Sequence, residues 1–195
     1  HEALNCFELM QGDGIYPTVV TFICVLKACA SIRDIRKGCQ IHGQIVNRGE
    51  NLETDVVLGT ALVDMYAKCG ALSKAHQVLN GLPTRNIASW NALIAGYTQQ
   101  GEAREAVTCF KKLQDEGLSP DSITFTCILK ASGSIGGIEI GKQIHNDTVN
   151  GNLLHKDDVL STALVNMYAQ CGFLENAREV LEELPNRNAN SWSAL

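Results

Sequence analysis

The sequence lacks any run of about 18 apolar residues, the length that a membrane-spanning helix requires. Its eight cysteines include no Cys-x-x-Cys pair, which argues against a zinc site of paired thiolates. Charged residues are scarce at 19%, and the net charge of −5 argues against binding nucleic acid through bulk positive charge. What remains is a chain of 195 residues that is 45% hydrophobic, enough to form a sizeable core.

Two further absences concern local structure and processing. No alternating strand pattern, hairpin dipeptide or βαβ pattern occurs, so we expect no β-sheet. The chain begins at His1 without an initiator methionine or a charged-then-apolar leader, so we expect an excerpt of a longer polypeptide whose location these residues do not reveal. We expect the cysteines to be reduced and mostly buried as small hydrophobic residues.

What is present is self-similarity, because the first half of the chain recurs in the second half. Residues 56–93 match residues 158–195 at more than half of their positions. Such a period is typical of repeat architectures, in which one structural unit is copied along the chain. The other matching segments are Glu2-Ala3 with Glu105-Ala106, Cys6-Phe7 with Cys109-Phe110, Thr21-Phe22 with Thr124-Phe125, Leu26-Lys27-Ala28 with Leu129-Lys130-Ala131, and Gln40-Ile41-His42 with Gln143-Ile144-His145.

Each shorter unit within this period has the pattern of two amphipathic helices. In residues 87–121, Gly101 ends the first helix, and Gly117 with Pro120 ends the second. The pair cannot bury its apolar face alone, so neighbouring pairs must stack. The sequence therefore predicts an all-α fold, a right-handed α-solenoid of stacked helix-turn-helix repeats with the first helices lining one surface. The apolar face of the first helix in this unit is formed by Trp90, Leu93, Ile94 and Tyr97.

These units resemble the pentatricopeptide repeat. Residues 87–121 resemble its P variant through Asn91-Ala92-Leu93-Ile94-Ala95-Gly96-Tyr97, Glu105-Ala106 and Pro120-Asp121. The segments from Thr60 to Gly70 and from Thr162 to Gly172 resemble the short S variant, and those from Thr21 to His42 and from Thr124 to His145 the long L variant. The resemblance divides the chain into 1–18 (second helix of a partial P repeat), 19–55 (L), 56–86 (S), 87–121 (P), 122–157 (L), 158–188 (S) and 189–195 (start of a P repeat).

This repeat order resembles the PLS subclass of the family, which implies sequence-specific binding of single-stranded RNA with one base per repeat. It implies the specificity module of a plant factor for cytidine-to-uridine RNA editing, in a mitochondrion or chloroplast. Accessory editing-factor proteins are implied as further partners, whereas no cofactor, membrane or small-molecule substrate is expected. We also expect no catalysis from these residues, because they lack the HxE and PCxxC segments of a zinc deaminase.

In the family, the fifth and last residues of a repeat read the base, and the second residue clamps it. The implied reading pairs are Ile23 with Asp55, Thr60 with Asn86, Asn91 with Asp121, Thr126 with Asp157 and Thr162 with Asn188, followed by Ser193 alone. The implied clamp residues are Val20, Val57, Ala88, Ile123 and Val159. Lys68, at the end of a first helix, is an implied phosphate contact.

By the family's code, Thr with Asn favours adenine, Asn with Asp favours uracil, and Thr with Asp favours guanine. The expected footprint is N-A-U-(G or N)-A, since long repeats follow the code poorly. Ile23 has no hydrogen-bonding group, so its repeat is expected to read nothing.

Several alternatives stay open. Thr60, Asn91 and Thr162 can instead satisfy backbone donors, and Asp121 and Asp157 can act as N-caps, alone or together with base reading. A factor for RNA processing or stabilisation without editing would use the same surface. A protein-binding helical scaffold is the rival of another class, although the unequal repeat lengths disfavour it. We expect four further residues to pack in the structure rather than to serve a metal or a base: His42, His145, Trp90 and Trp192.

Overall fold

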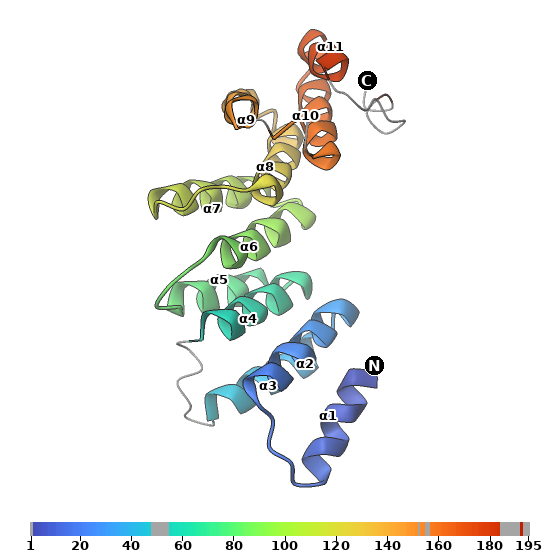
Figure 1. Ribbon diagram of the computed structural model, residues 1–195, viewed down its shortest axis with the longest axis vertical. Helices are drawn as coiled ribbons and strands as arrows, with labels where there is room; N and C mark the ends of the chain where they lie inside the picture. Colours follow the sequence, from blue (N-terminus) through green and yellow to red (C-terminus); the bar gives the residue numbers. More distant parts are fainter. Residues whose placement is uncertain (1, 48–54, 152, 155–156, 184–191, 193–195) are drawn as a thin grey trace. The chain divides into compact units, whose positions relative to one another are not determined.

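A computed structural model describes residues 2–47, 55–151, 153–154, 157–183 and 192 (Figure 1). Helices are the only regular elements of these described residues, so the predicted all-α fold is confirmed. No described helix combines the length and hydrophobicity needed to cross a bilayer. The helices are α1 (Glu2–Gly12), α2 (Val19–Ile32), α3 (Ile35–Asn47), α4 (Val56–Lys68), α5 (Leu72–Gly81), α6 (Ile87–Gln99), α7 (Ala103–Asp115), α8 (Ser122–Ile135), α9 (Ile138–Asn150), α10 (Asp158–Gln170) and α11 (Leu174–Glu183).

The chain divides into two compact units, residues 1–96 and residues 97–195. In the first unit, α2 packs against α1, α3 and α4, and α4 packs against α3 and α5. The rings of Phe7 on α1 and Phe22 on α2 lie with their centroids 6.2 Å apart, and both side chains are buried. Aromatic contact between a second helix and the next first helix therefore joins neighbouring pairs.

The second unit repeats this packing. Helix α8 contacts α7, α9 and α10, and α10 contacts α9 and α11. The ring centroids of Phe110 on α7 and Phe125 on α8 lie 6.5 Å apart. Each unit is thus a stack of helix pairs, as the repeat pattern predicts.

Local sequence explains where the helices begin and end. Thr18 caps α2 by accepting a hydrogen bond from the backbone N–H of Thr21 at 3.3 Å. Gly70, with φ +81°, ends α4 in the left-handed region that glycine adopts without strain. Gly101 ends α6 in the same way, with φ +78°. The first helices begin at Val19, Val56, Ile87, Ser122 and Asp158, which places the second and fifth residues of each predicted repeat within the first turns.

Candidate functional site

The second position of the first helices is apolar and exposed. Val20 and Val57 of the first unit are 68% and 62% exposed, and Ile123 and Val159 of the second unit are 60% and 67% exposed. Ala88 on α6 is also exposed. Single exposed apolar residues are common, but within each unit they recur at one place on successive first helices, where a ligand can contact them.

The fifth position holds half-buried threonines, and two of them have hydroxyl groups with a defined direction. The Oγ1 of Thr60 donates to the carbonyl oxygen of Val56 at 2.7 Å, and that of Thr162 donates to the carbonyl of Asp158 at 2.7 Å. A hydroxyl has one proton and two lone pairs. Both threonines therefore present acceptor lone pairs beyond their own helix.

Two other fifth residues differ from these threonines. Ile23 on α2 is half-buried and apolar, as the sequence implied. Asn91 on α6 is buried, with only 7% of its surface exposed. Its amide is therefore less accessible to a ligand than the threonine hydroxyls are.

The last residues of the long repeats cap the helices that follow them. The Oδ1 of Asp55 accepts from the backbone N–H of Val57 at 2.9 Å and of Leu58 at 3.1 Å. The Oδ1 of Asp157 accepts from the equivalent N–H groups of α10 at 3.0 and 3.1 Å. Each carboxylate uses one oxygen as the N-cap, so the other oxygen remains directed away from these backbone donors.

The last residues of the other repeats form reciprocal capping boxes. The Oδ1 of Asn86 accepts from the N–H of Ser89 at 2.8 Å, which assigns the amide oxygen to the helix and turns the Nδ2 donor outward. The Oδ1 of Asp121 accepts from both the N–H and the Oγ1 of Thr124, at 2.8 and 2.9 Å. Capping and base reading are thus compatible in one side chain. Asn188 and Ser193 lie outside the described residues.

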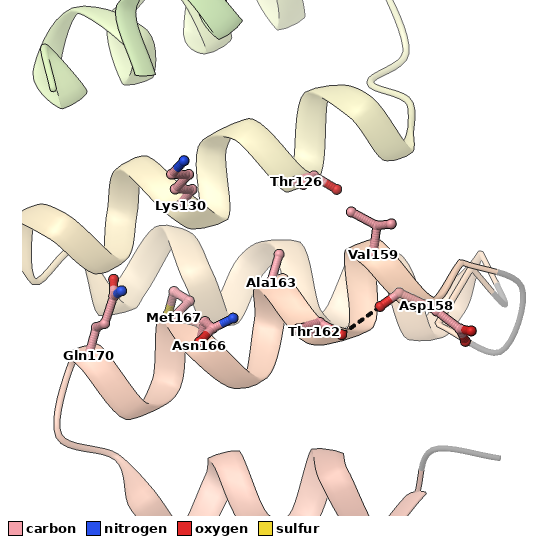
Figure 2. A pocket seen from close by; sticks show the side chains of 9 residues that line it. All are labelled: Thr126, Lys130, Asp158, Val159, Thr162, Ala163, Asn166, Met167 and Gln170. Atoms are coloured by element: carbon pink, nitrogen blue, oxygen red, sulfur yellow. Dashed lines mark hydrogen bonds between the residues drawn. The ribbon is translucent and has the colours of Figure 1, made fainter. Parts of the chain in front are cut away.

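A cavity of about 480 Å³ opens between α8 and α10 (Figure 2). It brings together the fifth residues of two adjacent predicted repeats, Thr126 and Thr162, with the clamp residue Val159. The sequence predicts these three site residues from separate segments. The rest of the lining is formed by Lys130, Asp158, Ala163, Asn166, Met167 and Gln170.

Lys130, Asn166 and Gln170 were not predicted as site residues. The recurrence of Leu26-Lys27-Ala28 as Leu129-Lys130-Ala131 carried the signal for Lys130, since a lysine repeated within an apolar segment is conspicuous. Asn166 and Gln170 follow Thr162 by one and two helical turns, and so lie on its face. Their spacing of four and eight residues from Thr162 could have identified them from the sequence.

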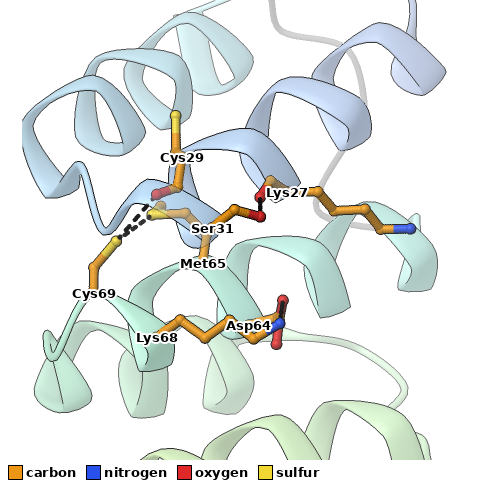
Figure 3. Close-up of polar contacts among 7 residues, drawn as sticks. All are labelled: Lys27, Cys29, Ser31, Asp64, Met65, Lys68 and Cys69. Carbon is orange, nitrogen blue, oxygen red and sulfur yellow. Dashed lines mark hydrogen bonds and ion pairs between the residues drawn. The ribbon is translucent and has the colours of Figure 1, made fainter. Parts of the chain in front are cut away.

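The implied phosphate contact, Lys68, already has an acidic partner. Its Nζ lies 2.8 Å from Oδ2 of Asp64, one turn earlier on α4 (Figure 3). An exposed pair of this kind is weak, so Lys68 can still exchange partners. Its role in phosphate binding stays a prediction.

The two recurring histidines pack as predicted. Nδ1 of His42 lies 2.8 Å from the hydroxyl of Tyr66, and Nδ1 of His145 lies 2.9 Å from the hydroxyl of Tyr168. Each ring also meets its tyrosine ring edge-on. No group of His, Cys, Asp and Glu within the described residues is arranged to hold a metal ion.

The two tryptophans differ. Trp90 on α6 is buried, which confirms the prediction that it belongs to the core. Trp192 is 57% exposed, so the same prediction is wrong for this residue, because the described helices leave more than half of its surface uncovered.

All eight cysteines are free thiols, as predicted. The prediction that most are buried is wrong, because only Cys29 and Cys109 are buried and Cys6 and Cys24 lie on exposed helix faces. Burial raises the pKa of the Cys29 and Cys109 thiols to about 11. The Sγ of Cys69 lies 3.9 Å from the carbonyl oxygen of Cys29 (Figure 3). The two buried thiols thus stay protonated near neutral pH and act as packing groups.

Sequence models of one repeat family match most of this architecture. The PPR repeat family matches residues 85–133, the pentatricopeptide repeat domain matches residues 1–31, and the PPR repeat matches residues 60–87 and 159–188. The chain belongs to the pentatricopeptide repeat family. Its helix pairs are therefore pentatricopeptide repeats, as the sequence resemblance indicates.

Curated relatives match over the whole chain. A chloroplastic pentatricopeptide repeat-containing protein of Arabidopsis thaliana is 38% identical over 194 residues, covering 100% of this chain and 24% of the relative. A mitochondrial one from the same plant is 38% identical over 195 residues, covering 100% of this chain and 30% of the relative. The chain therefore spans 24% to 30% of the length of these relatives.

Solved structures of the pentatricopeptide repeat protein PPR10 share the fold. PPR10 from maize superposes with a TM-score of 0.69 at 23% identity, covering 97% of this chain and 27% of that one. PPR10 in complex with an 18-nt psaJ RNA element gives a TM-score of 0.74 at 23% identity, covering 91% of this chain and 26% of that one. These likenesses confirm the helical-repeat fold.

Proposed function

We propose that this pentatricopeptide repeat chain binds single-stranded RNA sequence-specifically, one base per repeat, as the specificity module of an organellar cytidine-to-uridine editing factor of the PLS subclass. The observation that carries the proposal is the cavity between α8 and α10, where Thr126, Thr162 and Val159 lie on one surface. The likeness in fold to PPR10, which was solved with RNA, supports it. Relatives named chloroplastic and mitochondrial support an organellar location.

Hydrogen-bond direction supports adenine as the base read by Thr60 and Asn86. Thr60 donates its proton to its own helix and therefore offers an acceptor. Asn86 uses its Oδ1 as a cap and therefore offers its Nδ2 as a donor. Adenine presents one donor, N6–H, and one acceptor, N1, on its Watson-Crick edge. One acceptor and one donor on the protein complement this edge.

The chemistry of the side chains supports guanine for Thr126 with Asp157. Asp157 uses Oδ1 as a cap, and its carboxylate has only acceptors to offer a base. Guanine presents two donors, N1–H and N2–H, so a hydroxyl oxygen and a carboxylate oxygen complement it. Asn91 with Asp121 offers an amide donor and an acceptor, which matches the O and N3–H groups of uracil, although uracil binding requires the buried Asn91 to become accessible.

The exposed apolar residues supply sequence-independent affinity. A base that lies between two clamp residues, such as Val57 and the next clamp Ala88, covers apolar surface that the folded chain leaves in water. This contribution favours any base equally. Specificity then depends on the fifth and last residues.

The substitution Asn86→Asp tests the base-reading code, because it exchanges only the side-chain NH2 group for a carboxylate oxygen. It keeps the N-cap, since Asp caps as well as Asn, and replaces the outward amide donor by an acceptor. We expect the preferred base at that nucleotide to change from adenine to guanine, with discrimination altered about tenfold or more, since one bidentate base contact is worth about 1–3 kcal/mol. Fluorescence anisotropy with RNAs that differ only at that nucleotide measures the change.

Asp55→Asn is the matched control. It makes the same type of exchange in a repeat whose fifth residue, Ile23, has no hydrogen-bonding group, so the base preference there should not change. An unchanged adenine preference in Asn86→Asp, with RNA binding intact, would overturn the code assignment. Absence of RNA binding by the intact protein would favour the protein-binding scaffold. Binding with the expected code but without any effect on editing in the plant would favour a processing or stabilising factor.

A further inference from the structure

The first helices differ in charge from the chain as a whole. Helices α2, α4, α6, α8 and α10 contain three lysines and two aspartates, a net charge of +1 in a chain of net charge −5. The only charged side chains on this row of helices are Lys27, Lys68 and Lys130 with Asp64 and Asp158. The first helices thus carry a small net positive charge, while the aspartates Asp55, Asp121 and Asp157 lie just before three of them.

Lys27 and Lys130 are the cations of this row that make no ion pair within the described part of the chain. Lys68 is compensated by Asp64 at 2.8 Å. Lys27 and Lys130 are both exposed, and they occupy the same place on α2 and α8, the first helices of the two long repeats. The first helix of each long repeat therefore presents one lysine without an ion pair among the described residues.

Lys27 and Lys130 each lie about one helical turn after the fifth residue of their repeat. Lys27 follows Ile23 by four residues, and Lys130 follows Thr126 by four residues. Residues four apart share a helix face and lie about 6 Å apart along the axis. A lysine side chain at this place can reach the backbone of a nucleotide whose base lies at the fifth residue.

The cavity between α8 and α10 contains one of these two lysines. Lys130 lines it together with Thr126 and Thr162 (Figure 2). Asp158, the carboxylate of the lining, lies at the start of α10 beside Val159, at the opposite end of the view from Gln170. At the positions equivalent to Asp64 and Lys68, helix α10 carries the neutral amides Asn166 and Gln170. Lys130 is therefore the cation of this cavity.

We propose that Lys27 and Lys130 bind phosphates of the RNA backbone, one for each long repeat, which rests on the proposed RNA-binding function. A long repeat then holds the strand through a phosphate, in addition to any base contact that its fifth and last residues make. This assignment explains why Ile23 can stand at a base-reading position: its repeat still contributes Lys27. Lys68, the implied phosphate contact of a short repeat, differs from these two lysines because its Nζ lies 2.8 Å from Oδ2 of Asp64.

Salt dependence of binding by the intact protein tests the assignment. For single strands, each phosphate that a protein neutralises contributes about −0.7 to the slope of log K against log salt, over about 50 to 200 mM salt. We expect Lys27→Gln and Lys130→Gln each to make the slope shallower by about this amount. Affinity should fall equally for RNAs that differ only in base sequence, since a phosphate contact carries no sequence information.

Two control variants separate a local contact from overall charge. Lys111→Gln removes one exposed lysine from the second helix α7, and the slope should stay unchanged. Lys112→Gln removes a second exposed lysine from the same helix, and the slope should again stay unchanged.

A chemically modified RNA identifies the phosphate. A neutral methylphosphonate at the linkage between the nucleotides of the Thr126 and Thr162 repeats should weaken wild-type binding and leave Lys130→Gln unaffected. Unchanged slopes in both lysine variants, with base preference intact in the wild type, would overturn this assignment and leave the proposed function standing. A wild-type protein that binds no RNA would overturn both.

Discussion

Two buried serines of the second unit differ in whether their hydroxyl groups have a partner. Ser132 on α8 is fully buried, and its Oγ has no hydrogen-bond partner within the described chain. Ser161 on α10 is equally buried, but its Oγ lies 2.6 Å from the carbonyl oxygen of Leu154 and 2.9 Å from that of Asp157. An unsatisfied buried hydroxyl costs about 1–3 kcal/mol, whereas a satisfied one is mildly stabilising.

We therefore expect opposite effects from the same substitution. Ser132→Ala should raise the free energy of unfolding by about 1 kcal/mol, and Ser161→Ala should lower it by about 1 kcal/mol. Urea denaturation followed by circular dichroism measures both variants. Equal destabilisation in the two variants would contradict the account of Ser132.

His145 couples the stability of the second unit to pH. Burial lowers the pKa of its imidazole below 6.5, although Glu183 and Glu179 act in the opposite direction. As pH falls through about 6.5, the unfolded chain takes up a proton that the folded chain does not yet bind, so stability decreases on acidification. We expect the melting temperature to fall below about pH 6.5 more steeply in the wild type than in His145→Gln. Identical profiles would exclude His145 as the titrating group.

At the scale of a helix, N-caps and base readers can be separated by experiment. Asp157 caps α10 through Oδ1, so Asp157→Ala should lower the free energy of unfolding by about 1 kcal/mol. Asp157→Asn should leave stability nearly unchanged, because Asn caps equally well. Thermal denaturation of the two variants checks this. Equal destabilisation by both would mean that the carboxylate charge, rather than the cap, stabilises the helix.

Alanine substitutions at two glycines test how closely the helices pack. A Cβ on Gly96 of α6 would lie 2.9 Å from the Cβ of Ala67 and 2.9 Å from the Cδ2 of Leu72, so Gly96→Ala should lower the free energy of unfolding by about 1–3 kcal/mol. Gly43 within α3 has open space around it, so Gly43→Ala should raise it by up to about 1 kcal/mol through helix propensity alone. Chemical denaturation distinguishes the signs, and destabilisation by Gly43→Ala would refute the packing argument.

At the scale of the whole molecule, the low charge predicts RNA binding that depends only weakly on salt concentration. A net charge of −5 gives no long-range attraction, and only Lys27 and Lys130 of the first helices lack an ion pair within the described chain. We expect a slope of log K against log salt of about −1.4 for the two contacts in this chain, shallow for a nucleic-acid-binding protein. Titration of RNA in increasing salt measures it, and a slope steeper than about −3 would show additional phosphate contacts.

Much of the fold could be predicted because its signals are local. The apolar face through Trp90 and Leu93, and the left-handed glycines Gly70 and Gly101, depend only on neighbours within one helix pair. The ion pair of Asp64 with Lys68 was equally visible as an i, i+4 spacing, although the sequence pattern singled out only the lysine.

The sequence by itself determined the repeat period, the helix pairs and the residues at the second, fifth and last positions, because periodicity and turn residues act over a few residues. Only the tertiary structure decided how those positions meet. It buried Asn91 and placed Lys130 in a cavity between α8 and α10. These outcomes depend on which side chains of neighbouring helices cover one another, which no single segment of the sequence contains.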